Sequence, residues 1–197
     1  MAWNDPVSHK ESAARPAAGP ITSRDNPLIK EYARLAADAA FRRESGLFAL
    51  EGARLCADAA ASGAAVRTVL YTARAAEQYG AYLGPLLSVC PDCREIAAPL
   101  AGRLSDTQTP QGIFCICRRL DNRLPLGKIK RNGRYLLLED VQDPGNLGTI
   151  VRTAEAFGID GLFLTAGCCD LYNPKVLRGS MGGVLRLASA RTEDPSG

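Results

Sequence analysis

Short apolar runs alternate with segments of helical periodicity along almost the whole chain. The apolar runs lie at 47–50 (LFAL), 66–72 (VRTVLYT), 112–117 (GIFCIC), 135–140 (YLLLED), 161–165 (GLFLT) and 184–189 (VLRLAS). β-Branched and aromatic side chains favour strands, and strands that alternate with helices are typical of α/β proteins. The 135–140 run is apolar without alternation, as expected of a parallel strand covered on both faces. The sequence therefore predicts an α/β fold that contains a parallel sheet.

Capping residues mark several of the intervening helices. Asn26–Pro27 and Asn173–Pro174 each place an N-cap asparagine before a proline at the first helical position. The first of these helices is predicted to bury a stripe made of Leu28, Tyr32, Leu35 and Ala39, and the second is predicted to run to about Met181. Further helices are predicted at 53–62 (ended by Gly63), 73–83, 94–103 and 149–157 (with Ile150, Ala154 and Phe157 on one face, ended by Gly158).

A basic stretch divides the chain. Residues 1–20 are small and polar, which predicts a flexible leader, and residues 21–117 predict a small α/β domain. Residues 118–134 form a basic linker, and residues 135–197 begin a second α/β domain. The linker contains Arg118, Arg119, Arg123, Lys128, Lys130, Arg131 and Arg134 against the single acid Asp121. Such a run is either a solvated linker or a stripe that contacts the phosphates of a nucleic acid.

The scarcity of histidine excludes several kinds of chemistry. His9 is the single histidine in 197 residues and lies in the polar leader, which argues against a Ser-His-Asp triad and a multi-histidine zinc site. No apolar run reaches the length of a membrane span, so we expect a cytoplasmic protein without membrane association. The seven cysteines, including Cys90 and Cys93, are expected to be metal-free thiols, and Cys115 and Cys117 to be buried in a strand.

A glycine-containing segment, DPGNLG at 143–148, follows the 135–140 run. It is predicted to be a loop at the carboxyl edge of the sheet, where α/β proteins bind ligands. Because it lacks both GxGxxG and GK[ST], it predicts neither a dinucleotide site nor a P-loop. Arg152 follows in the helix and points away from the apolar stripe. It is either a solvated arginine paired with Glu155 or a functional group.

The segment EDVQDPGNLGTIVRTAEAFGIDGLFLT resembles the first motif of the SpoU/TrmH family of RNA ribose 2′-O-methyltransferases, within the SPOUT superfamily. Asn146, Gly148 and Arg152 occupy the family's motif positions. NPKVLRGSMGGVLRL resembles the next block, with Arg178, Ser180 and Gly182 at the matching places. SRDNPLIKEYARLAADAAFRRESGLFALEGARLCADA and LSDTQTPQGIFCI are similar to the family's accessory substrate-binding domain, so the resemblance covers nearly everything from Ile21 to Ser189.

This resemblance implies methyl transfer from S-adenosylmethionine to a ribose 2′-hydroxyl of ribosomal or transfer RNA. It implies Arg152 and Asn146 as catalytic residues. A guanidinium has a pKa above about 12, so Arg152 is better suited to clamp a phosphate and orient the hydroxyl than to act as a free base. The candidate RNA-binding residues are Arg24, Asn26, Lys30, Arg42, Arg43, Lys128, Lys130, Arg131, Arg178 and Ser180. For those in the accessory domain, a solvated helix face is the alternative interpretation.

The resemblance ends before the family's last motifs. In the family these motifs form a deep trefoil knot that holds S-adenosylmethionine, and the family is commonly homodimeric through that domain. Nothing after Ser189 resembles them, so we expect a C-terminally truncated chain, with the knot segment missing and no cofactor-binding residue retained. The expected function is that of an RNA methyltransferase at the family level, inactive as this chain alone. The alternative is a non-catalytic RNA-binding protein derived from a truncated methyltransferase.

Overall fold

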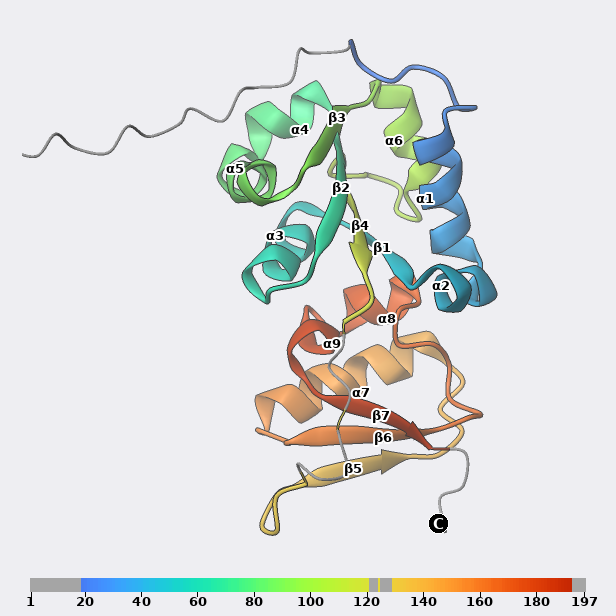
Figure 1. Cartoon of the computed structure of the whole chain (residues 1–197), viewed down its shortest axis with the longest axis vertical. Coiled ribbons are helices and arrows are strands. Elements are labelled where there is room, and N and C mark those ends of the chain that lie inside the picture. The colour runs from blue at the N-terminus through green and yellow to red at the C-terminus, as the bar shows by residue number, and fades with distance from the viewer. Residues whose placement is uncertain (1–18, 121–123, 125–128, 193–197) are drawn as a thin grey trace, which may run out of the picture.

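The computed structural model describes residues 19–120, 124 and 129–192, which form two α/β regions, each built on its own sheet (Figure 1). The residues up to 18 of the predicted leader, and Lys128, lie outside the described residues. The first region holds the four-stranded sheet and residues up to Arg118, and the second holds a three-stranded sheet and starts at Tyr135. This confirms the α/β fold class.

The sheet of the first region has the strand order β1-β4-β2-β3. β4 is antiparallel to both β1 and β2, whereas β3 is parallel to β2. The strands are β1 (Leu47–Glu51), β2 (Val66–Tyr71), β3 (Asp92–Glu95) and β4 (Ile113–Arg118). The helices are α1 (Pro27–Ala37), α2 (Ala39–Ser45), α3 (Ala53–Ala61), α4 (Ala73–Gln78), α5 (Gly80–Val89) and α6 (Ala98–Leu104).

Helices cover both faces of this first sheet (Figure 1). Side chains of a strand point alternately to opposite faces, and in β4 Phe114 and Ile116 join the cluster with α1 and α6. Cys115 and Cys117 point to the other face, toward α3 and α5, and are fully buried as predicted. Burial raises the pKa of the Cys117 thiol, so this cysteine acts as a small hydrophobic side chain.

The sheet of the second region is parallel throughout, in the order β5-β6-β7. Its strands are β5 (Tyr135–Leu138), β6 (Gly161–Thr165) and β7 (Ser189–Thr192), and its helices are α7 (Pro144–Ala156), α8 (Pro174–Gly179) and α9 (Gly183–Arg186). These three helices lie between the two sheets (Figure 1). The fully buried Leu162 and Leu164 belong to a cluster that also contains Phe48 of β1, so one apolar core spans both regions.

The face of the second sheet that points away from these helices is only partly covered. Leu137 of β5 is 52% exposed, and Tyr135 lies against Phe163 of β6 with a ring-centroid distance of 6.0 Å. The prediction that the 135–140 run is covered on both faces was therefore wrong. An apolar run without alternation fits an edge strand of a one-sided sheet equally well when nothing packs on its outer face.

The predicted glycine loop is in fact the first turn of α7. Asp143 is the N-cap, its Oδ1 accepts a hydrogen bond from the Asn146 N–H at 2.7 Å, and Pro144 takes the first helical position. This is the same capping chemistry that was recognised correctly at Asn26 and Asn173. The buried stripe of α7 consists of Leu147, Val151 and Ala154, whereas Phe157, predicted on this stripe, is 72% exposed.

Four other elements differ from the sequence-based prediction, and one of them is the predicted 73–83 helix, which is divided between α4 and α5. Helix α1 ends at Ala37, because Asp38 caps the next helix, and it buries Ile29 rather than Leu28. The predicted 94–103 helix is divided between β3 and α6. The predicted 184–189 strand is largely the short helix α9, which follows the left-handed Gly182 (φ 87°), and the strand comes later, as β7.

Within the described part of the chain, no helix is long and apolar enough to cross a membrane. The same residues contain no group of three or more histidine, cysteine or acidic side chains suited to a metal ion. The seven cysteines, all of them described, are free thiols in this structure. The metal-free state remains a prediction.

Candidate RNA-binding and catalytic site

The candidate site lies where α7 and α8 face the first region. Arg178 of α8 forms ion pairs with two carboxylates of the first region, Asp106 at 2.8 Å and Glu51 at 3.7 Å. Arg186 pairs with Glu155 of α7 and approaches Asp58 of α3 at 3.9 Å. At the groove between the two regions, Arg178 and Arg186 are therefore already engaged with acidic side chains.

Arg152 of α7 differs from Arg178 and Arg186 in its contacts. It is exposed on α7, and its Nη1 lies 3.7 Å from the Met181 sulfur. No ion pair joins Arg152 to a carboxylate within the described ranges. Glu155, the partner considered for a solvated Arg152, accepts hydrogen bonds from Arg186 instead. Apart from Nη1, which donates to the Met181 sulfur, the guanidinium of Arg152 has no hydrogen-bond partner among the described residues and is open to a ligand.

Asn146, the second predicted catalytic residue, is exposed in the first turn of α7. It stands six residues before Arg152, which on an α-helix is a rise of about 9 Å and a rotation of about 120° between the two side chains. No hydrogen bond connects the two residues in the described structure. Asn146 and Arg152 therefore present separate groups on the exposed surface of the helix.

Gly148, between them, lets α7 and α8 approach closely. A Cβ atom at this position would lie 2.9 Å from the Val176 carbonyl oxygen and 3.0 Å from Gly179 Cα. A side chain here would push the two helices apart. Close packing at Gly148 therefore places Arg152 beside the segment that carries Met181.

Two predicted RNA-binding residues have structural roles instead. Arg42 is only 2% exposed, and its Nε donates to Asp170 Oδ2 at 2.7 Å while its Nη1 donates to the Leu35 carbonyl at 2.7 Å. Ser180 is fully buried, and its Oγ donates to the Leu177 carbonyl at 2.9 Å. A buried group that is already hydrogen-bonded cannot contact RNA, so both assignments were wrong. Arg42 joins the two regions, and Ser180 caps α8.

The other candidates are spread over the molecule. Asn26 caps α1 by accepting from the Leu28 N–H at 2.9 Å, and Lys30 pairs with Asp25 at 2.8 Å. Lys130 pairs with Asp160 at 2.6 Å, and this hydrogen bond raises the pKa of Lys130. Arg24, Arg43 and Arg131 are exposed. The start of α1 and the start of β5 lie near opposite ends of the long axis (Figure 1), so these residues do not form one cluster.

Sequence reasoning missed the acidic partners of the groove. Asp106 is 72 residues from Arg178, and Glu155 is 31 residues from Arg186. Contacts at such separations have no periodic signal in a single sequence. A clue was present for Glu51, which is the last residue of the buried strand β1 and thus stands at the carboxyl edge of the sheet.

Two of the described cavities do not match S-adenosylmethionine. The cavity beside Met181 has a volume of about 200 Å³, below the range of about 300–1,000 Å³ that small-molecule sites occupy. A larger cavity of about 760 Å³ is lined by Arg43, Arg119 and Arg191, whose charges repel the sulfonium of this cofactor. Neither of these two cavities therefore fits the cofactor.

The fold defines the class of this protein, because solved RNA methyltransferases have the same fold. An AdoMet-bound rRNA methyltransferase from Sinorhizobium meliloti matches with a TM-score of 0.75 and 28% identity, over 88% of this chain and 64% of that one. The AdoMet complex of the SpoU methyltransferase AviRb from Streptomyces viridochromogenes matches with a TM-score of 0.74 and 25% identity, over 87% and 64%. The chain has the α/β architecture of SPOUT methyltransferases.

Family models and sequence relatives give the particular family. Residues 133–196 match the SpoU rRNA Methylase family, and residues 26–115 match the MRM3-like substrate binding domain. The chain is 35% identical over 169 residues to an uncharacterized tRNA/rRNA methyltransferase of Synechocystis, and 30% identical over 176 residues to the 23S rRNA (guanosine(2553)-2′-O)-methyltransferase RlmP of Bacillus subtilis. These alignments cover 85% and 89% of this chain. The chain belongs to the SpoU methylase family.

The chain spans 60% of the length of the Synechocystis relative and 66% of the length of RlmP.

Proposed function

We propose that this chain acts in the 2′-O-methylation of RNA, with S-adenosylmethionine as the methyl donor and ribosomal or transfer RNA as the substrate. The observation that carries the proposal is the exposed guanidinium of Arg152, which forms no ion pair with a described carboxylate, whereas Arg178 and Arg186 are both paired. The family membership and the names of the relatives support the same reaction. The proposed compartment is the cytoplasm, and the proposed assembly is a homodimer.

In this proposal the two regions divide the work. Residues 21–117 form the RNA-binding domain, residues 118–134 the linker, and residues 135–197 the part that carries the catalytic side chains. The match of residues 26–115 to a substrate binding domain supports this division. Arg24, Lys30, Arg43 and Arg131 remain the candidates for backbone contact, because they are exposed.

Arg152 would position the reacting ribose without losing its proton. A guanidinium stays protonated in proteins, so Arg152 donates hydrogen bonds to a phosphate oxygen and to the 2′-oxygen rather than accepting a proton. Such contacts hold the hydroxyl in the reactive orientation. Asn146 can both donate to and accept from the ribose, and its exposed position in the first turn of α7 suits this role. Both are proposed to act by orientation and electrostatics.

The test is methyl transfer from labelled S-adenosylmethionine to ribosomal RNA by the natural protein that contains this chain. Arg152→Ala is expected to lower the rate about 100-fold or more, as for loss of a group that stabilises the transition state, and Arg152→Lys to restore only part of it. Arg74→Ala, an exposed arginine on α4, is the matched control. An unchanged rate in Arg152→Ala would contradict the assignment. RNA binding without any methylation in the unmodified protein would favour the non-catalytic alternative.

A further inference from the structure

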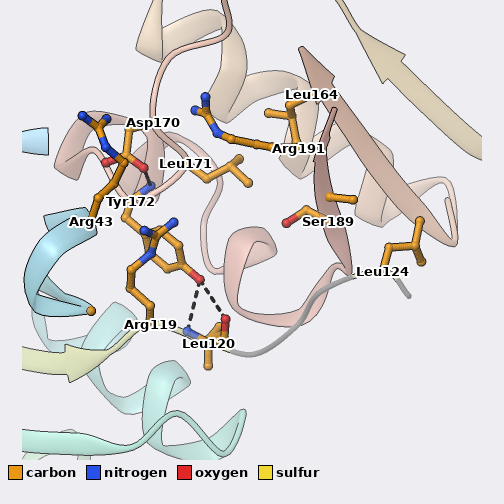
Figure 2. Close-up of a pocket in the computed structure, with 12 residues that line it drawn as sticks. Arg43, Arg119, Leu120, Leu124, Leu164, Asp170, Leu171, Tyr172, Ser189 and Arg191 are labelled. Carbon is orange, nitrogen blue, oxygen red and sulfur yellow. Dashed lines mark hydrogen bonds between the residues drawn. The ribbon is translucent and has the colours of Figure 1, made fainter. Parts of the chain in front are cut away.

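A cavity of about 760 Å³ opens where α2 and the end of β4 meet the second region (Figure 2). The first region contributes Arg43 and Arg119, and the second contributes Tyr172 and Arg191. Figure 2 shows Arg43 and Asp170 on one side and Arg191 and Ser189 on another, with Tyr172 and Arg119 between them. The volume is within the range of about 300–1,000 Å³ that is usual for small-molecule sites.

The cavity carries an excess of positive charge. Three arginines line it, and Asp170 is the single carboxylate among its described lining residues. That carboxylate is already neutralised, because Asp170 Oδ2 accepts a hydrogen bond from the buried Arg42 at 2.7 Å. Arg43, Arg119 and Arg191 form no ion pair with any carboxylate in the part of the chain that is described. Three uncompensated guanidinium groups around one cavity favour an anion.

Two of these arginines are held in place before any ligand arrives. The Arg119 guanidinium lies over the Tyr172 ring, 4.7 Å from its centroid, and the Tyr172 hydroxyl in turn accepts from the Leu120 N–H at 3.1 Å. Arg191 donates to the carbonyl oxygens of Cys168 and Cys169 at 3.1 and 2.9 Å. Fixed side chains lose little conformational entropy on binding. Arg43 is exposed at the rim.

Most of the remaining lining residues are apolar, and Ser189 is the polar exception among the described ones. Leu124, Leu164 and Leu171 lie against the cavity and are themselves largely buried. A site with an apolar floor, a stacked arginine and a cationic rim matches the two parts of a nucleotide. The planar base suits the leucines and the Arg119 guanidinium plane, and the phosphate suits the forked donors of arginine.

We propose that this inter-region cavity binds one nucleotide of a single-stranded RNA segment, with its phosphate held by Arg43 and Arg191 and its base against Arg119 and the leucine floor. The inference rests on the proposed function in taking RNA as the ligand, and it places a contact away from Arg152. A nucleotide bound here would touch both regions at once. It would fix the RNA relative to the catalytic groove.

The experiment measures binding of a fluorescein-labelled single-stranded RNA octamer to the whole chain by anisotropy, at several salt concentrations. Arg43→Gln is expected to weaken binding about fivefold to tenfold and to lower the slope of log K against log salt by about 0.7, the value for one lost contact to a single strand. Arg74→Gln removes the same charge from α4 and is expected to change neither. Arg191→Gln is expected to weaken binding at least as much, with thermal unfolding followed in parallel.

Competitors identify the ligand. Unlabelled octamer should displace the probe at the lowest concentration, AMP and inorganic phosphate only at much higher concentration, and S-adenosylmethionine not at all. Equal binding by Arg43→Gln and Arg74→Gln would overturn the proposal. Displacement by AMP as effective as by RNA would overturn it in favour of a free nucleotide, and displacement by S-adenosylmethionine would overturn it in favour of the cofactor. Because the readout is binding, a failure of the methyl-transfer assay leaves this test intact.

Discussion

The two sheets of this protein differ in how completely they are covered. The four-stranded sheet has helices on both faces, and its central strand β4 is buried from Ile113 to Cys117. The three-stranded sheet has helices on one face only, and its edge strand β5 contains no fully covered stretch, with Leu137 52% exposed. The first region thus stabilises itself from both sides. The second depends on the core that α7–α9 share with the first region.

The largest expected effect comes from cutting the tie between the two regions. Arg42→Ala leaves Asp170 without its partner in a poorly solvated site, which should lower the free energy of unfolding by about 3–5 kcal/mol. Urea unfolding measures the change, and Arg43→Ala, the exposed neighbour, should leave stability nearly unchanged. The double variant Arg42→Met, Asp170→Leu should recover much of the loss. A loss as small in Arg42→Ala as in Arg43→Ala would show that the regions do not depend on this pair.

The next prediction compares one leucine in each sheet. Leu70 of β2 is fully buried, so Leu70→Ala should cost about 2–5 kcal/mol of unfolding free energy. Leu137 of β5 is half exposed, and Leu137→Ala should cost less than about 1 kcal/mol. Thermal unfolding gives both values. Similar losses at the two positions would mean that the open face of the second sheet is covered in solution.

Two glycines sharpen the comparison at the level of helix packing. Gly148→Ala in α7 puts a Cβ against backbone atoms of α8, and should destabilise the protein by about 1–3 kcal/mol despite the better helix propensity of alanine. Gly102→Ala in α6 meets no atom within 4 Å, and should stabilise by up to about 1 kcal/mol. Chemical denaturation distinguishes the signs. A stabilising Gly148→Ala would refute the close approach of α7 and α8.

The smallest expected effect is on the reactivity of one thiol, that of Cys90, which interacts with Cys93 in the first region. A hydrogen bond from Cys93 lowers the pKa of the Cys90 thiol to about 7, so its thiolate should form as the pH rises through 7. Cys93→Ala removes that hydrogen bond, so the pKa of Cys90 should rise and its alkylation by iodoacetamide at pH 7 should slow about tenfold. Mass spectrometry of the labelled peptides follows the rate, with buried Cys117 as the unreactive reference. An unchanged rate would show that Cys93 does not act on Cys90.

Local chemistry explains which parts of the fold were predictable. The caps at Asn26 and Asn173 are contained within two adjacent residues, and both helices start where predicted. The same signature at Asp143–Pro144 was passed over because two glycines follow it and indicate a loop. The run at 184–189 is apolar enough for either a helical turn or a strand. Whether a helical turn or a strand forms there depends on how the residues after Gly182 pack against the rest of the protein. The local sequence does not contain that tertiary packing.

The candidate site divides in the same way. The exposure of Arg152 followed from helix periodicity, since its stripe could be located from the apolar residues around it. The burial of Arg42 did not, because its partner Asp170 lies 128 residues later. Arg42 and Arg43 are neighbours on the same short helix, and the local sequence does not distinguish them. Arg42 links the two regions, whereas Arg43 lies at the rim of the cavity. The difference arises because Arg42 pairs with the distant carboxylate of Asp170.

The Arg42–Asp170 pair also sets an order of events during synthesis. Arg42 is translated 128 residues before Asp170, so at about 5–20 residues per second the ribosome needs roughly 6 to 26 seconds to supply the partner. During that interval the guanidinium of Arg42 on α2 has no partner carboxylate, so it has to remain hydrated. The nascent first region can complete its sheet as soon as β4 emerges. The surface around Arg42 that faces the second region nevertheless stays hydrated until Asp170 has been synthesised.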